Sequence, residues 1–211
     1  MEADEPRFLG ALRALAAALR DIDAPSMTIG GVSVIALGVP RFTADIDATV
    51  LGGSVDPETM LAVLSKHAIA PRIEGAAAFA KQNQVLLLRH EPSRVPIDIA
   101  IAWLEFERAA IARSREIDYA GVLLRIPTAE DLVIYKIAAG RPRDVDDAEK
   151  LVTLHRAEID AARVRAVVHE FSVALEDPSR DEIAARLLGP AKPPPRRSRP
   201  KERRKPRRRT R

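Results

Sequence analysis

The sequence contains no cysteine, so neither disulfide bonds nor thiolate metal ligands can contribute to its stability or chemistry. A chain without disulfides fits a reducing compartment. No apolar run approaches the ~18 residues of a membrane span, and the start, Met1-Glu2-Ala3-Asp4-Glu5, lacks the basic residues that open a signal peptide. We therefore expect a cytoplasmic protein with no membrane contact. Histidine metal sites are also disfavoured, because the four histidines are scattered without ligand spacing: His67, His90, His155 and His169.

Positive charge is concentrated at the C-terminal end of the chain. From Ala191 onward there are twelve Lys and Arg against one acid, Glu202, a net charge of +11, so the rest carries −7 in a chain of total charge +4. This segment combines prolines and basic residues without an apolar anchor, which predicts disorder over 191–211. Its charge favours weak, salt-sensitive attraction to nucleic-acid phosphates. A solvated terminus that touches nothing specific is the alternative, since no aromatic residue is present there to stack on bases.

The sequence before this segment predicts an α+β fold, because expected strands interrupted by helices are followed by helices only. We divide it into a core with an N-terminal helix (1–126), a C-terminal helical part (127–190) and the tail (191–211). Strands are expected at 27–29, 41–50, 85–88, 95–101 and 121–126. Helices are expected at 8–22, 32–38, 57–67, 103–112, 128–139, 144–155, 160–175 and 181–188, and 71–81 is expected to be mostly loop.

The segment 41–50 has a polar and an apolar face when it is read with the period of a strand. One face carries Arg41, Thr43, Asp45, Asp47 and Thr49, and the other carries Phe42, Ala44, Ile46, Ala48 and Val50. Like charges two positions apart on one strand repel, so the carboxylate pair favours a cation between its members. Mg²⁺ (or Mn²⁺) prefers such oxygen ligands and keeps positions open for phosphate.

A glycine turn precedes this strand. The run Met27-Thr28-Ile29 ends in Gly30-Gly31 and passes into a short apolar helical segment. Glycine allows a ligand to approach the backbone closely, and the N–H groups of a helix start attract anions. A glycine turn beside paired carboxylates suits a nucleoside triphosphate (NTP), with backbone amides on its phosphates and a metal between phosphates and protein. Ser33 is the nearest hydroxyl to this turn.

Asp98 is the third candidate acid. It interrupts the apolar run Ile97-Asp98-Ile99-Ala100-Ile101, where an unpaired carboxylate is costly to bury. If this strand lies beside the Asp45/Asp47 strand, three carboxylates meet and can hold two metals about 4 Å apart. Asp98 is then both a metal ligand and the candidate general base for an acceptor hydroxyl.

Together these residues resemble the nucleotidyltransferases of the DNA polymerase β superfamily. The pattern consists of Gly30-Gly31, then Arg41-x-Thr43-x-Asp45-x-Asp47, then an isolated Asp98. Two downstream runs make the chain similar to the AbiEii/MenT-like bacterial nucleotidyltransferases, some of which are toxins of toxin–antitoxin pairs: Leu132-Val133-Ile134-Tyr135-Lys136 and Arg141-Pro142-Arg143-Asp144-Val145-Asp146-Asp147. The resemblance covers about residues 25–155.

The resemblance implies a polymerase-β-like core, a small mixed sheet flanked by helices, followed by the helical part. Asp45 and Asp47 would bind the metals, and the Gly30-Gly31 turn would hold the nucleotide phosphates. Lys136 would lie near the triphosphate and Asp144 would support the site. Many superfamily members have Gly-Ser where this chain has Gly30-Gly31.

Each of these residues also has a structural interpretation. Asp-x-Asp is common in solvated turns, Arg41 can simply balance the carboxylates, and Lys136 in an apolar helical run can extend its ammonium group to solvent. Asp144 can cap its helix. Trp103 is expected in the core rather than as a platform for base stacking.

The function that we expect is metal-dependent transfer of a nucleoside monophosphate from an NTP such as ATP to an acceptor hydroxyl, with release of pyrophosphate. The resemblance favours RNA, in particular a tRNA 3′ end, or a protein side chain as acceptor, and an antitoxin protein as partner. Three alternatives stay open: a non-catalytic nucleotide-binding protein with this fold, a nucleic-acid-binding accessory protein that acts through its basic tail, and a small-molecule nucleotidyltransferase of the antibiotic-modifying type.

Overall fold

The computed structural model describes residues 5–189, so the predicted tail at 191–211 lies outside the described residues. Local signals account for several helix ends. Asp56 caps α3 by accepting a hydrogen bond from the Thr59 amide at 3.0 Å, and Thr128 caps α6 by accepting one from the Asp131 amide at 3.1 Å. The helices are α1 (Glu5–Asp21), α2 (Gly30–Ala36), α3 (Pro57–Lys66), α4 (Ala76–Asn83), α5 (Glu105–Arg113), α6 (Ala129–Ala139), α7 (Pro142–Leu154), α8 (Ala161–Ala174) and α9 (Ser179–Leu188).

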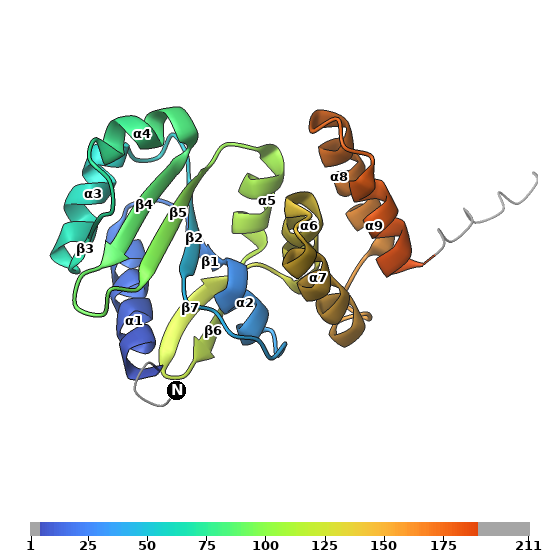
Figure 1. The fold of residues 1–211 in the computed structure, drawn as a ribbon, viewed down its shortest axis with the longest axis horizontal. Helices are drawn as coiled ribbons and strands as arrows, with labels where there is room; N and C mark the ends of the chain where they lie inside the picture. Colours follow the sequence, from blue (N-terminus) through green and yellow to red (C-terminus); the bar gives the residue numbers. More distant parts are fainter. Residues whose placement is uncertain (1–4, 190–211) are drawn as a thin grey trace, which may run out of the picture.

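Two sheets organise the core (Figure 1). The larger has the strand order β1-β2-β5-β4-β3, and β6 pairs with β7 in a separate two-stranded sheet. The pair β2–β5 is parallel, whereas β1–β2, β4–β5, β3–β4 and β6–β7 are antiparallel. The expected mixed sheet flanked by helices is confirmed. The strands are β1 (Ser26–Ile29), β2 (Ile46–Leu51), β3 (Ile69–Pro71), β4 (Val85–His90), β5 (Pro96–Ala102), β6 (Arg115–Tyr119) and β7 (Val122–Ile126).

The two faces of the large sheet differ in polarity. One face is apolar and belongs to the main core, where residues such as Ile46, Ala48 and Ile99 are fully buried together with Leu12 of α1 and Leu64 of α3. The register of β2 and β5 puts acids and small residues on the other face. That second face is only partly covered, by a small apolar cluster under α5: Met27, Ala102, Ala110 and Ile111.

The helices α6–α9 gather beside the sheet (Figure 1). A fully buried carboxylate, Asp131, ties them to the core by accepting hydrogen bonds from Arg113 (2.7 Å), Arg163 (2.8 Å) and Thr128 (2.8 Å). Burial by itself would raise the pKa of Asp131, but the hydrogen bonds from Arg113, Arg163 and Thr128 outweigh it and hold that pKa below its usual value. α5, α6 and α8 therefore meet at one charged centre.

The segment 41–50 is a strand only in its second half. β2 begins at Ile46, because its partners end there: β1 stops at Ile29 opposite Asp47, and β5 starts at Pro96. Residues 41–45 consequently form a loop, and Phe42, expected on the apolar face, is 73% exposed.

Three other expectations were wrong. The segment 71–81 is not mostly loop, since β3 ends at Pro71 and the alanine-rich run after Gly75 forms α4. A strand at 115–119 was missed, and it pairs with β7. Trp103 is 68% exposed rather than in the core, because it follows β5 directly, where the chain turns into α5.

None of the helices within residues 5–189 combines the length and the apolarity needed to cross a bilayer.

We predict that Asp131→Ala lowers the free energy of unfolding by about 2 kcal/mol, because it removes the buried acceptor of hydrogen bonds from three side chains, leaving Arg113 without its carboxylate partner and Arg163 with Glu130 alone. Urea denaturation followed by circular dichroism measures this loss. Asp146→Ala is the matched control: Asp146 lies on the surface of α7 and, among the described residues, pairs only with Lys150, so its removal should cost less than about 0.5 kcal/mol. Equal losses in the two variants would contradict a structural role for Asp131.

Candidate functional site

The Gly30–Gly31 turn joins β1 to α2 and packs directly against acidic and hydroxyl side chains. Gly30 has a φ of +65°, and a Cβ there would lie 1.9 Å from Oδ2 of Asp47. A Cβ on Gly31 would lie 2.5 Å from Oγ1 of Thr43. Both positions therefore require glycine, and the backbone of the turn lies against the Asp47 carboxylate.

Two of the predicted acids are neighbours across adjacent strands. In the parallel register of β2 and β5, Asp47 lies directly beside Asp98 on the same face of the sheet. Asp45 precedes β2 and is exposed, and its Oδ1 accepts a hydrogen bond from Thr43 Oγ1 at 2.9 Å. The structure thus brings Asp45, Asp47 and Asp98 into one neighbourhood at the polar face.

The environment of Asp47 raises the pKa of its carboxyl group. Burial, and after it the negative charges of Asp45 and Asp98, raise the pKa of Asp47 to about 6 against the opposing charges of Lys136 and Arg141. The pKa of Asp98 is also raised, first by burial and then by Asp45, while the Arg72 guanidinium opposes the shift. A cation close to these carboxylates would relieve the repulsion.

Asp98 already has a cationic partner. Arg72, which directly follows β3, forms an ion pair with the Asp98 carboxylate, and its own amide is fixed by a 2.9 Å hydrogen bond to the Leu87 carbonyl. Among residues 5–189, no group of three or more His, Cys, Asp or Glu side chains is arranged to hold a metal ion as it stands. The expected meeting of three carboxylates at one metal point is therefore incomplete, because Arg72 binds the third of them.

A buried ion network borders the carboxylates. Lys136 of α6 is 6% exposed, and its Nζ lies 2.9 Å from both Asp144 and Asp147 of α7. Asp147 also pairs with Arg41 from the loop before β2, and Asp144 pairs with Arg141. Of the structural interpretations, extension of Lys136 to solvent is wrong, and so is capping by Asp144, since the N-cap of α7 is Arg141.

Ser33 does not belong to this site. Its side chain is fully buried, and its Oγ donates a 2.8 Å hydrogen bond to the Thr28 carbonyl, so the hydroxyl is turned toward β1. Ser33, which the sequence offers as the hydroxyl nearest to the glycine turn and thus as a candidate for binding the nucleotide, instead ties the start of α2 to the preceding strand.

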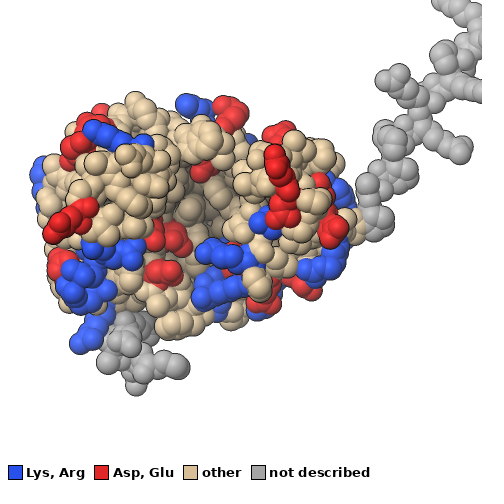
Figure 2. Space-filling model, turned by 45° about the horizontal axis from the view of Figure 1, so that its top comes forward, with Lys and Arg blue, Asp and Glu red and all other residues tan. Residues whose placement is uncertain are grey.

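Three charged residues of the site were not identified as such from the sequence. Arg72 lay in a segment without a readable pattern, and nothing local indicated its partner. Arg141 and Asp147 carried a signal, because both belong to the 141–147 run, and Asp147 stands one helical turn after Asp144 on the same helix face. Seen from outside, acidic side chains lie in a hollowed part of one face of the molecule, with Lys and Arg side chains on both sides of them (Figure 2).

No protein-family model and no curated protein sequence matches this chain. Solved structures do match. The solution structure of the antibiotic-resistance factor ANT(2″)-Ia superposes with a TM-score of 0.56 at 16% identity, over 82% of this chain and 96% of the other. A crystal structure of ANT(2″)-Ia in complex with adenylyl-2″-tobramycin gives a TM-score of 0.51 at 19% identity, over 77% and 95%.

A third match is an antigenic nucleotidyltransferase-like protein from Paracoccidioides brasiliensis, with a TM-score of 0.52 at 12% identity, over 85% of this chain and 96% of the other. At these identities the likeness establishes the fold: the chain has the nucleotidyltransferase fold, as the sequence predicted. The narrower AbiEii/MenT-like resemblance stays a prediction.

We predict that Gly30→Ala destabilises the protein by about 1–2 kcal/mol more than Gly53→Ala. Both glycines have positive φ, +65° and +78°, so each alanine incurs the backbone penalty of about 1 kcal/mol, but a Cβ on Gly53 meets nothing within 4 Å. Chemical denaturation measures both losses. In an Asp47→Ala background the excess at Gly30 should shrink, because the overlapping carboxyl group is gone. An undiminished excess would show that the carboxyl group of Asp47 is not the cause.

Proposed function

We propose that this protein is a metal-dependent nucleotidyltransferase, which moves a nucleoside monophosphate from an NTP to an acceptor hydroxyl and releases pyrophosphate. The single observation that carries the proposal is Asp47, a partly buried carboxylate with its pKa raised to about 6, held beside Asp98 and against a glycine turn. Such an arrangement destabilises the fold unless a cation is bound, so it fits a site built for one.

The donor set suits Mg²⁺ or Mn²⁺, because it offers carboxylate oxygens and no nitrogen or sulfur ligand. Asp45 and Asp47 would hold the metal, and Asp98 would join them once Arg72 releases it. When bound, the metal supplies charge stabilisation to the phosphoryl oxygens and favours ionisation of the attacking hydroxyl.

The remaining groups of the site would bind the triphosphate and accept the proton of the acceptor hydroxyl. The Gly30–Gly31 backbone leaves room for the triphosphate to approach, and Lys136 and Arg141 add positive charge near it. The acceptor oxygen attacks the α-phosphorus, the bond from that phosphorus to the bridging oxygen breaks, and pyrophosphate leaves with the electron pair. Asp98, whose raised pKa suits a general base, accepts the hydroxyl proton.

Lys136 acts in this scheme through its charge and through position. Both of its carboxylate contacts are at 2.9 Å, so its ammonium group is held firmly at the junction of α6 and α7. Asp144 and Asp147 keep it there, and Asp147 also fixes Arg41 beside the turn. Arg41 and Thr43 thereby orient the loop that carries Asp45.

The proposal extends to the class of molecule that receives the nucleotide. The AbiEii/MenT-like resemblance supports an RNA hydroxyl, such as a tRNA 3′ end, or a protein side chain, in a toxin controlled by an antitoxin, and the basic 191–211 segment would add weak attraction to RNA. The crystallised product of the structural neighbour ANT(2″)-Ia, adenylyl-2″-tobramycin, supports a small hydroxyl compound instead. All three classes share the same transfer chemistry.

We predict that the purified full-length chain transfers label from α-³²P-NTPs in the presence of Mg²⁺ to one of three acceptors: total tRNA, cell-lysate protein or tobramycin. Asp45→Ala, Asp47→Ala and Asp98→Ala should each reduce transfer at least ~100-fold, because each removes a ligand or the base. Asp146→Ala, on the exposed surface of α7, should retain wild-type transfer.

Two outcomes contradict the proposal. Transfer by Asp47→Ala at the wild-type rate would exclude these carboxylates from the chemistry. NTP binding in calorimetry without transfer to any acceptor would select the non-catalytic alternative, which the ion pair between Arg72 and Asp98 supports, since it occupies the acid needed as base.

We predict that Asp47→Asn stabilises the protein at pH 8 by about 1–3 kcal/mol, because the folded state raises the pKa of this carboxyl from 3.8 to about 6. A raised carboxyl pKa means that the folded state binds the proton more tightly, so wild-type stability falls as the pH rises from about 4 to above 6. The difference between variant and wild type should therefore vanish near pH 4. Urea denaturation at pH 4 and pH 8 checks both the size and the sign.

The same pair of proteins tests for the cation. Millimolar Mg²⁺ at pH 8 should raise the Tm of the wild type more than that of Asp47→Asn, because the cation offsets a repulsion that the variant lacks. An equal response in the two proteins would count against a metal at Asp47.

A further inference from the structure

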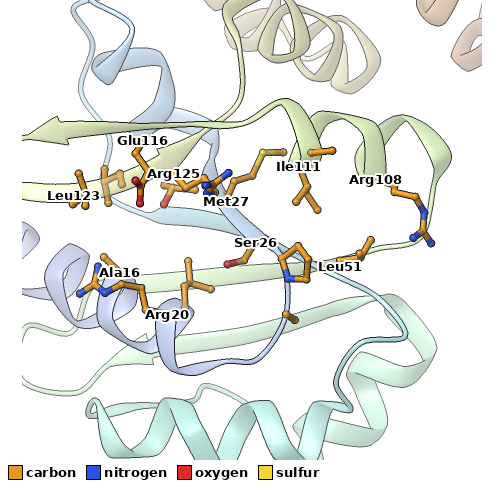
Figure 3. A pocket seen from close by; sticks show the side chains of 16 residues that line it. Ala16, Arg20, Ser26, Met27, Leu51, Arg108, Ile111, Glu116, Leu123 and Arg125 are labelled. Atoms are coloured by element: carbon orange, nitrogen blue, oxygen red, sulfur yellow. The ribbon is translucent and has the colours of Figure 1, made fainter.

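A second hollow, of about 420 Å³, lies along β1 at the edge of the large sheet (Figure 3). α1 and α5 border it, and β6 and β7 contribute its remaining wall. Its volume falls within the range of small-molecule pockets. None of its lining residues belongs to the carboxylate site or to the Lys136 network.

The hollow combines an apolar interior with positive charge. Met27, Ile111 and Leu124 contribute buried apolar surface, while Arg20 and Arg125 are exposed at its border. With Arg108, the lining holds three arginines against one acid, Glu116. This charge of +2 stands out because residues 1–190 carry −7 in total.

In the part of the chain that the structure describes, none of these arginines forms an ion pair with a carboxylate of the hollow, although Glu116 stands opposite Arg125 in the β6–β7 register. Within residues 5–189, Arg20 makes no hydrogen bond or ion pair, and Arg125 donates only to the Ser114 carbonyl (3.2 Å) and hydroxyl (3.1 Å). Arg108 has a single 3.8 Å contact with the exposed Glu105, which does not line the hollow. In Figure 3 the Arg125 side chain lies beside Met27, and Arg108 lies at the other end near Ile111. The guanidinium groups are therefore available to an incoming anion.

We propose that this hollow binds a small amphipathic anion, an aromatic or aliphatic body that carries one phosphate or carboxylate group. The apolar body would displace water from the solvent-accessible apolar lining, namely the exposed Leu123 and the partly exposed Leu51. The anionic group would take up charge-assisted hydrogen bonds from Arg20 and Arg125, whose planar guanidinium groups match phosphate and carboxylate geometry. Such a site is separate from nucleotidyl transfer and does not depend on that activity.

The methionines provide a reporter for the test. The chain has three, Met1, Met27 and Met60, and of the two described ones Met27 lines the hollow while Met60 is fully buried in α3. Full-length protein labelled with ¹³C at the methionine methyl groups is titrated with 1-naphthyl phosphate at pH 7.5. We expect a saturable shift of the Met27 signal and no shift of the Met60 signal.

Two matched compounds test whether binding needs both the apolar body and the anionic group of 1-naphthyl phosphate. Neutral 1-naphthol has the same apolar body without the anion, and inorganic phosphate has the anion without the body. Each should bind at least ~10-fold more weakly than 1-naphthyl phosphate, as judged by the Met27 shift. Equal binding of 1-naphthol would overturn the role of the arginines, and equal binding of inorganic phosphate would overturn the role of the apolar interior.

Variants test the assignment of the site. Arg20→Gln and Arg125→Gln should each weaken 1-naphthyl phosphate at least ~10-fold, and Ala112→Trp, at an exposed lining position on α5, should abolish the Met27 shift by filling the hollow. Arg13→Gln, two turns before Arg20 on α1 and outside the hollow, is the charge-matched control and should bind as wild type.

The basic 191–211 segment is present in every variant, so its attraction for anions is the same throughout. An unmoved Met27 signal in the wild type overturns the proposal. So does a Met27 shift that persists unchanged when both arginines are replaced. Methyl spectra of the free variants with an unaltered Met60 signal establish that they are folded.

Discussion

The parallel pairing of β2 with β5 sets two carboxylates, Asp47 and Asp98, side by side on one face of a sheet. Sheet hydrogen bonding fixes this proximity, because neighbouring strands lie only ~4.8 Å apart and the register leaves neither side chain another face to occupy. The fold thus places two like charges on neighbouring positions of one sheet face. Much of the surrounding structure consists of groups that reduce their repulsion or hold them in place.

Positive charge reaches the pair from two directions. Arg72 comes from the chain just after β3 and binds Asp98, while Lys136 and Arg141 come from the helical part and act on Asp47 from a distance. Even with these charges present, the pKa of Asp47 remains near 6. Burial is the first cause of this raised pKa and the charges of Asp45 and Asp98 add to it, so the cations of the protein offset these effects only in part. The cation site that we propose is consistent with this incomplete compensation.

The helical part of the chain gives this arrangement its rigidity. Lys136 is buried with two carboxylates, and one of them, Asp147, also holds Arg41 in the loop before β2. Because unpaired buried charges are costly, α6, α7 and the 41–45 loop cannot separate without exposing or orphaning at least one of these groups. The loop has no strand partner of its own, so the position of Asp45 depends on helices a hundred residues further along the chain.

That dependence marks the limit of what the sequence could predict. Alternation identified the apolar faces of 46–50 and 97–101, and two adjacent glycines identified the turn, since each signal is carried by residues next to one another in the chain. The superposed nucleotidyltransferase structures agree with the fold that these signals predicted. The strand was extended too far, to Arg41, because alternation describes a local pattern and does not reveal where the partner strands end.

The ion-pair partners of charged residues were harder to predict from the sequence than the strands and turns on which those residues lie. Nothing near Arg72 indicates Asp98, 26 residues away, and nothing near Arg41 indicates Asp147, 106 residues away. The sequence predicts a functional role for Asp98 because a lone acid in an apolar strand is costly, and that argument holds whichever cation neutralises it. A sequence pattern can therefore reveal that a charge needs a partner, whereas only the packed structure reveals which partner it has and whether that partner must leave before a ligand can bind.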